Sequence, residues 1–162
     1  MTTYRKTAVL VGSAFLFSNI TFILGTIGMV EPALGSPNDL SLISASRASV
    51  VLGVLLSFAN GLAYVGIAAL LFPILRQRFE SLALAYVGFR CMELITQILA
   101  DISPLALLTL AEKAGPVATA QGLGAVLLAE RFWAFQMLNL IFSLSALLLN
   151  LSRGHVVDVQ AL

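Results

Sequence analysis

The sequence has 162 residues, of which 59% are hydrophobic and 10% are charged, and its formal net charge is +1. A soluble domain carries about 25% charged residues, so a soluble protein of this composition could not cover its surface with charge. These values exclude a disordered chain, a coiled coil and an ordinary cytosolic enzyme. They indicate a multi-pass membrane protein that is surrounded by a lipid bilayer.

The scarcity of cysteine, histidine and clustered basic residues excludes several kinds of site and partner. The single cysteine, Cys91, excludes a disulfide within the chain and a thiolate metal site. The single histidine, His155, leaves no imidazole for a metal site or a catalytic triad inside the membrane. No run of basic residues is present, so nucleic acid is not expected as a partner. We therefore expect no metal and no cofactor.

Four apolar segments follow one another, and each is long enough to cross a bilayer, which needs about 20 residues. They cover residues 7–30, 48–75, 81–110 and 117–151. Pro104 is expected to kink or end the third helix, because proline lacks an N–H and clashes with the preceding turn. We expect one all-α membrane domain over residues 1–162, a bundle of four transmembrane helices with a tail at residues 152–162.

The distribution of basic residues predicts the orientation of this bundle. Four spans place the N-terminus, the hairpin at residues 76–80 and the tail on one side of the membrane. That side carries Arg5, Lys6, Arg76, Arg78 and Arg153, whereas the other side carries Arg47 and Lys113. Because Lys and Arg are in excess on the cytoplasmic side, we expect both termini to be cytoplasmic and the protein to lie in the plasma membrane.

The third span carries a stripe of polar side chains on one face. Its members, spaced by four, three, four and four residues, are Tyr86, Arg90, Glu93, Gln97 and Asp101. At about 100° per residue they fall within an arc of about 80°. A charge at the bilayer centre costs at least ~2.5–3.5 kcal/mol. We therefore expect this stripe to face other helices or water rather than lipid.

The other three spans offer polar partners for this stripe. Arg131 in the fourth span is expected to pair with Asp101, and this register brings Gln97 to the depth of Gln136. The remaining candidates are Asn19 in the first span, Asn60 and Tyr64 in the second, and Asn139 and Ser143 in the fourth. Gln136, Asn139, Ser143 and Asn150 share one face of the fourth span, which we expect to lie against the stripe.

Three interpretations of this polar network remain open. The first is structural: Arg90 and Glu93 pair at a spacing of three on their own helix, and amides and hydroxyls complete the hydrogen bonds. The second is a binding site at mid-membrane depth in a small carrier, where Arg90 holds an anionic or carbonyl group and Glu93 handles a proton. The third is an interface with a second copy or another membrane protein. An intramembrane enzyme that uses Glu93 as acid or base is a more distant alternative. We favour a non-enzymatic protein with a structural network.

Pairs of small residues occur in the first two spans. Thr21 and Gly25 are four residues apart in the first span, and Gly53 and Ser57 are four residues apart in the second. Such pairs allow helix backbones to approach closely in membranes. We expect them to serve helix packing.

Six blocks along the chain together resemble a known family. They are RKTA (5–8), PALGSP (32–37), LFPIL (71–75), SLALAYVGFR (81–90), LLTL (107–110) and LLAERFWAF (127–135), with Glu93 after the fourth. In this order they resemble a bacterial family of multi-pass membrane proteins catalogued as domain of unknown function 4386. The resemblance implies a bacterial inner-membrane protein and no assigned activity. Members of the family look like six-helix proteins, with two further spans after the fourth, so this chain is expected to be a short form that lacks the last two helices. Phe132 stands where members usually have an acidic residue.

Overall fold

The computed structural model describes residues 2–35, 40–77, 80–113 and 117–160, and these ranges are helical apart from short turns, with no strand. Four of the helical segments are long and apolar enough to cross a membrane, which confirms the predicted fold class. The elements are α1 (Thr2–Phe22), η1 (Ile23–Val30), α2 (Glu31–Leu34), α3 (Leu40–Ala45), α4 (Arg47–Leu75), α5 (Glu80–Lys113) and α6 (Val117–Gln160).

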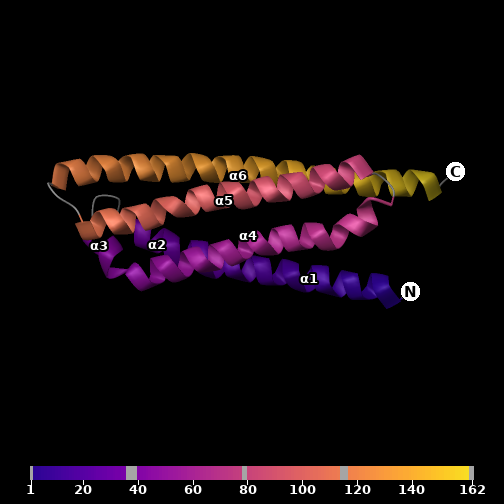
Figure 1. Ribbon diagram of the computed structural model, residues 1–162, viewed down its shortest axis with the longest axis horizontal. Helices are drawn as coiled ribbons and strands as arrows, with labels where there is room; N and C mark the ends of the chain where they lie inside the picture. Colours follow the sequence, from indigo (N-terminus) through magenta and orange to yellow (C-terminus); the bar gives the residue numbers. More distant parts are fainter. Residues whose placement is uncertain (1, 36–39, 78–79, 114–116, 161–162) are drawn as a thin grey trace.

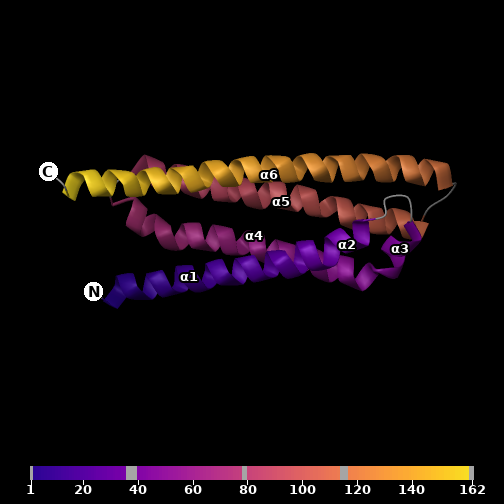
Figure 2. The same ribbon diagram turned by 180° about the vertical axis from the view of Figure 1, so that it is seen from behind.

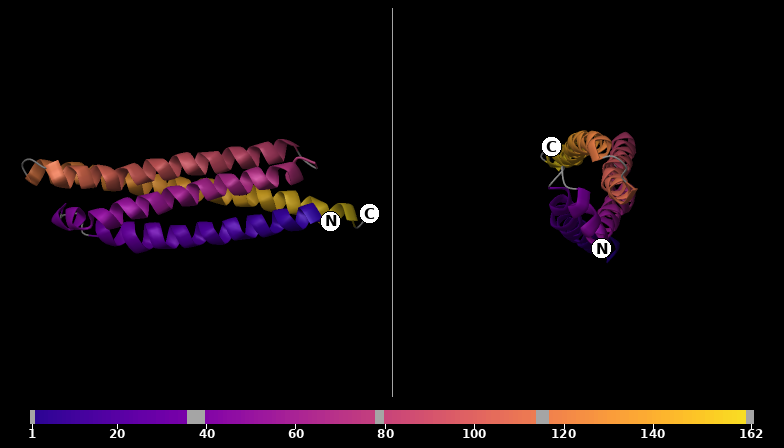
Figure 3. Two further views of the ribbon diagram at one scale, coloured as in Figure 1. Left: turned by 60° about the horizontal axis from the view of Figure 1, so that its bottom comes forward. Right: turned by 90° about the vertical axis from the view of Figure 1, so that its left-hand side faces the viewer.

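The long helices lie side by side in chain order. The two chain ends lie at one end of the bundle, and α2 and α3 lie at the other (Figure 1), as the view from behind also shows (Figure 2). In the contacts, α1 packs against α4, α4 against α5, and α5 against α6. The end-on view shows α1 and α6 at the two ends of this row (Figure 3). No extensive packing joins α1 to α6 in the described part of the chain, so α5 lies between two neighbours while α6 has one.

Two helices run further than the sequence predicts. The third span was expected to kink or end near Pro104; α5 does not end there and continues to Lys113. The fourth span was expected to end at residue 151, but α6 continues through most of the predicted tail to Gln160. No proline interrupts residues 152–160, so their backbone has no steric reason to leave the helix.

The first span contains a stretch of π-helix that periodicity does not predict. Over η1 the turns are wider, and the N–H of Glu31 bonds to the carbonyl of Thr26, five residues before it. Here the helix crosses α4 closely: a Cβ on Gly25 would lie 2.7 Å from the carbonyl oxygen of Gly53. The predicted packing role of the small-residue pairs is confirmed at this crossing.

The connection between the first two spans covers the end of the bundle away from the termini. Residues 36–39 lie outside the described ranges, and α2 and α3 flank them. Ile43 of α3 is 1% exposed because it packs into an apolar cluster with residues of η1, α2 and α5. The other buried members of the cluster are Val30, Leu34, Leu107 and Leu108. An exposed ion pair between Arg47 and Glu112, at 2.5 Å, joins α4 to α5 at the same end.

Candidate functional site

All five members of the α5 stripe are buried. The exposed fractions are 1% for Glu93 and Gln97, 2% for Tyr86, 3% for Arg90 and 5% for Asp101. The spacing of three and four residues places them on the face of α5 that contacts its neighbours, where lipid does not reach. Four of them belong to two groups, one around Arg90 and one around Arg131, and Gln97 bonds separately to α4.

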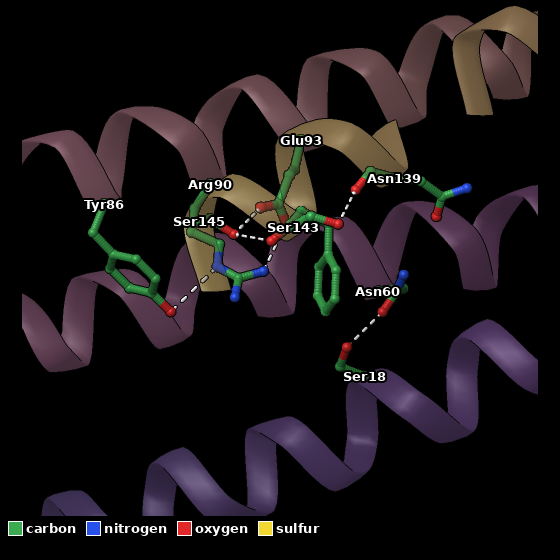
Figure 4. A network of polar contacts seen from close by, with 9 residues as sticks. Ser18, Asn60, Tyr86, Arg90, Glu93, Asn139, Ser143 and Ser145 are labelled. Atoms are coloured by element: carbon green, nitrogen blue, oxygen red, sulfur yellow. Dashed lines mark hydrogen bonds and ion pairs between the residues drawn. The ribbon is translucent and has the colours of Figure 1, made fainter. Parts of the chain in front are cut away.

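The Arg90 cluster consists of Arg90, Glu93, Tyr86, Tyr64, Phe142 and Ser145. Nη1 of Arg90 donates to a Glu93 carboxylate oxygen at 2.6 Å, and Nε donates to the Tyr86 hydroxyl at 3.2 Å. The second carboxylate oxygen of Glu93 accepts a hydrogen bond from Ser145 on α6 at 2.6 Å. Figure 4 shows these contacts. Both Glu93 oxygens are therefore satisfied by the chain itself.

Aromatic rings surround the guanidinium of Arg90. Its central carbon lies 5.1 Å from the ring centroid of Tyr64, 5.2 Å from that of Tyr86 and 5.4 Å from that of Phe142. A cation within about 6 Å of a ring face is attracted by the π-electrons, and more strongly when water is excluded. The three rings come from α4, α5 and α6, so the cluster links these three helices around one charge.

Two further hydrogen bonds link α4 to its neighbours. Gln97 of α5 donates to the Ser57 hydroxyl at 2.5 Å. On the other side of α4, the hydroxyl of Ser18 donates to the Asn60 side-chain oxygen at 2.6 Å. The amide nitrogen of the fully buried Asn60 has no partner within the described residues.

The Arg131 cluster, formed by Arg131, Asp101, Glu31 and the backbone carbonyl of Ala100, lies closer to α2 and α3. Arg131 is 4% exposed, as expected for a charge that avoids lipid. Its Nη2 contacts Glu31 at 2.8 Å, and its Nη1 donates to the carbonyl oxygen of Ala100 at 2.9 Å. The predicted pairing with Asp101 is present as an ion pair at 3.8 Å, which is too long for a hydrogen bond.

The carbonyl that Arg131 contacts is one that Pro104 leaves free. In an α-helix the N–H of residue 104 would bond to the carbonyl of residue 100, but proline has no N–H. Arg131 supplies the missing donor from α6. A membrane helix tolerates an internal proline when a neighbour satisfies the freed carbonyl. This contact explains why α5 continues past Pro104 instead of ending there.

Asp101 is the least satisfied group in the described part of the chain. Its side chain is 8% exposed, and the side chains of Ser57 and Gln97 lie near it, but neither carboxylate oxygen accepts a well-aligned hydrogen bond. A cavity of about 320 Å³ lies beside the cluster, and Arg131, Glu31 and the aromatic rings of Phe132 and Phe135 line it. Next to Arg131, Glu130 accepts a hydrogen bond from the hydroxyl of Ser103.

Gln97 and Asn60 form bonds outside the two clusters, and four further predicted network residues, all exposed, join neither cluster. Asn19 is exposed, and its amide bonds to the carbonyl of Phe15 on its own helix. The other three, from the face of α6 that was expected to meet α5, are also exposed: Gln136, Asn139 and Ser143. Figure 4 shows the Asn139 amide pointing away from Arg90 and Glu93. The prediction that this face of α6 meets α5 is wrong, because α6 is rotated so that another face packs inward.

The structure also adds residues that the sequence did not single out. Ser18 takes the place expected for Asn19, Ser145 that of Ser143, and Glu31 is a second carboxylate for Arg131. A signal for Ser145 was present, since Arg131, Leu138 and Ser145 recur every seven residues and all three are buried. Among the described residues, no group of three or more His, Cys, Asp or Glu side chains is placed to hold a metal ion.

Comparison with known proteins gives a family and no activity. The family model described as "Domain of unknown function (DUF4386)" matches residues 10–152. No curated protein and no solved structure matches the chain. The matched segment contains all of α4 and α5 and both arginine clusters. The chain, a membrane-spanning bundle with two buried arginine clusters, therefore belongs to the DUF4386 family.

Proposed function

We propose that this chain is a non-enzymatic integral membrane protein in which the Arg90 cluster stabilises the packing of α4, α5 and α6. The pairing of the Glu93 carboxylate carries this proposal: both of its oxygens already have partners from the chain. A catalytic or carrier site needs a polar group that is free to meet its ligand. We therefore assign Glu93 no role as an acid or a base.

The membrane gives a reason for such a cluster. Lipid tails are as apolar as leucine, so helices in a bilayer associate through close packing and hydrogen bonds rather than through the hydrophobic effect. The Arg90 cluster supplies both kinds of contact. The hydroxyl of Ser145 on α6 bonds to Glu93, and the rings of Tyr64 on α4 and Phe142 on α6 lie against the guanidinium.

The Arg90→Gln/Glu93→Gln double variant tests this role through its melting temperature in detergent. Removing both partners avoids an unpaired buried charge, which by itself costs about 3–5 kcal/mol. We expect the double variant to melt clearly below the wild type, because the cation–π contacts of Arg90 with Tyr64 on α4 and Phe142 on α6 are lost. Thr96→Val is the matched control, since this exposed hydroxyl on the same helix bonds only to the carbonyl of Met92, and its melting temperature should not change.

A double variant that melts at or above the wild type would contradict the structural role. The charges would then lower stability without serving the fold, as residues of a functional site commonly do.

A second candidate function rests on the Asp101 carboxylate, which is buried and accepts no hydrogen bond. In this candidate the protein binds a proton or a small protonated ligand near the Arg131 cluster. Two carboxylates, Asp101 and Glu31, face the single guanidinium of Arg131, which favours a cation over an anion. A pocket lined by Arg131 and Glu31 lies beside this cluster, and Asp101 is not among its lining residues. This moves the binding site of the carrier hypothesis from Arg90 towards the end of the bundle that carries α2 and α3.

Proton flux into proteoliposomes tests the second candidate. With a pH-sensitive dye inside and acid outside, we expect the wild type to dissipate the pH gradient faster than Asp101→Asn. Glu112→Gln, which changes an exposed carboxylate at the same end, is the control. Equal rates for the wild type and Asp101→Asn would exclude proton transport through this residue.

The excess of basic residues near the chain ends supports a plasma-membrane location with cytoplasmic termini. Single cysteines at Ser36 and Gln77, in a chain that lacks Cys91, test this orientation. In intact cells a membrane-impermeant thiol reagent should label position 36 alone. Labelling of position 77 alone would show that the orientation is the opposite one.

A further inference from the structure

The exposed face of α6 carries a second regular stripe. It runs from Gly122 to Asn150 in steps of three and four residues in turn, through positions 122, 125, 129, 132, 136, 139, 143, 146 and 150. All of these residues except Ala146 are exposed. At about 100° per residue this outer stripe lies about a third of a turn from the buried residues Arg131, Leu138 and Ser145. This spacing follows one face of any helix, and the neighbouring exposed series from Leu123 to Leu147 has it too, so the composition of the outer stripe is what distinguishes it.

The composition of the outer stripe is unusual for a surface that faces lipid. Its first half carries the small residues Gly122, Ala125 and Ala129, its second half carries the polar residues Gln136, Asn139 and Ser143, and the large ring of Phe132 lies between them. Small residues let helix backbones approach closely, and amides form hydrogen bonds between membrane helices. Both features belong to a helix–helix interface rather than to a lipid-facing surface.

The two central amides lie deep in the membrane. Along the antiparallel pair α5/α6, Arg131 meets Asp101 and Ser145 meets Glu93, so residues 136–139 are level with the middle of α5. Neither Gln136 nor Asn139 has a side-chain hydrogen bond within the described residues. Lipid tails offer no donor or acceptor, so an unpaired amide at this depth is costly. The stripe therefore needs a polar partner.

A second copy of the chain meets this need. Amides both donate and accept, so each can pair with its own counterpart. The stripe contains no charged side chain, so two copies do not repel each other. Copies in one membrane share the same orientation, and a two-fold axis along the membrane normal brings α6 parallel to α6, with every stripe residue opposite itself. A polar residue in the contact line between two helices fixes their register and the number of helices that associate.

We propose that the protein forms a homodimer through the outer stripe of α6, with the Gln136 and Asn139 amides hydrogen-bonded between the two copies at mid-membrane depth. This inference is independent of the role of the Arg90 cluster, because the stripe lies on a different face of α6.

Disulfide cross-linking in native membranes tests the proposal. In a Cys91→Ala background, Ala129→Cys and Ser143→Cys lie on the stripe, whereas Val126→Cys and Met137→Cys are controls that are 65% and 49% exposed but off the stripe. After mild oxidation we expect the stripe variants to give a product of twice the 17.2 kDa chain mass and the controls to remain monomeric. Equal yields at all four positions would indicate random collisions and overturn the proposal. A stripe cross-link of another mass would identify a different protein as the partner and also overturn it.

The affinity of the dimer provides a second measurement that does not depend on cysteine. Asn139→Leu should raise the dimer dissociation constant in detergent roughly tenfold, which corresponds to about 1.4 kcal/mol. Asn19→Leu removes an exposed amide from α1 and should leave the constant unchanged. A wild-type chain that is monomeric in membranes, or an Asn139→Leu variant that dimerises as tightly as the wild type, contradicts the proposal.

Discussion

The two buried arginines of this chain are compensated in different ways. Arg90 pairs with Glu93 on its own helix, and the two side chains are 4% and 1% exposed. Arg131 pairs with Glu31 from another element, and the Glu31 side chain is 53% exposed. Its other carboxylate, Asp101, is buried but 3.8 Å away. One arginine is thus part of a closed, neutral pair, and the other joins an open group in which negative charge is in excess.

This difference matters for the energy of each cluster. In a closed buried pair each charge depends on the other, because no water replaces a lost partner. In the open group, water reaches Glu31 and screens its attraction to Arg131. We therefore expect the Arg90 cluster to contribute to stability and the Arg131 cluster to tolerate change.

The largest expected effect separates the two ion pairs. Glu93→Gln leaves Arg90 without a counter-charge in the core and should lower the free energy of unfolding by about 3–5 kcal/mol. Glu31→Gln removes a half-exposed partner and should cost about 0–1 kcal/mol. Unfolding in mixed micelles, with denaturing detergent as the variable, measures both. If the two variants lose equal stability, the distinction between a closed and an open cluster is wrong.

An intermediate effect concerns the contact between Arg131 and the helix at Pro104. Pro104→Ala restores an N–H that can bond to the carbonyl of Ala100, so Arg131 is then no longer needed as its donor. Arg131→Gln should therefore cost less in the Pro104→Ala background than in the wild type, with a coupling energy of about 1 kcal/mol. A double-mutant cycle of unfolding free energies gives this value. Additive effects would show that the guanidinium does not replace the missing donor.

The α5 stripe could be predicted from the sequence because one strong physical constraint acts on it. Charges at the centre of a bilayer are costly, so a helix that carries Arg90 and Glu93 on one face must turn that face inward. The close approach of η1 and α4 was also predictable, since small residues such as Gly25 and Gly53 allow helix backbones to approach closely in membranes. Both predictions depend on local spacing alone.

The orientation of α6 could not be predicted in this way because the helix carries two stripes. Arg131 and Gln136 are five residues apart, or about 140° around a helix, so they cannot both face α5. The prediction that Arg131 pairs with Asp101 therefore conflicted with the prediction that Gln136 faces inward. The charge decides the orientation, since lipid excludes it more strongly than an amide. The π-helical turns of η1 could not be predicted either, because they depend on the crossing with α4 and not on a local sequence pattern.

The smallest expected effect is also the one that most directly relates the open cluster to function. Asp101→Asn removes a buried negative charge that accepts no hydrogen bond, while Arg131 keeps Glu31 and the carbonyl of Ala100 as partners. We expect its free energy of unfolding to match that of the wild type or to exceed it by up to about 1 kcal/mol, because a desolvated charge is no longer maintained. Gln97→Leu is the contrasting variant on the same face, and it should lose stability because it breaks the bond to Ser57. If Asp101→Asn is clearly less stable than the wild type, the carboxylate is a structural partner of Arg131 and the two clusters are alike. If it is as stable or more stable, the chain carries a buried charge that its fold does not require, which is the pattern of residues kept for binding.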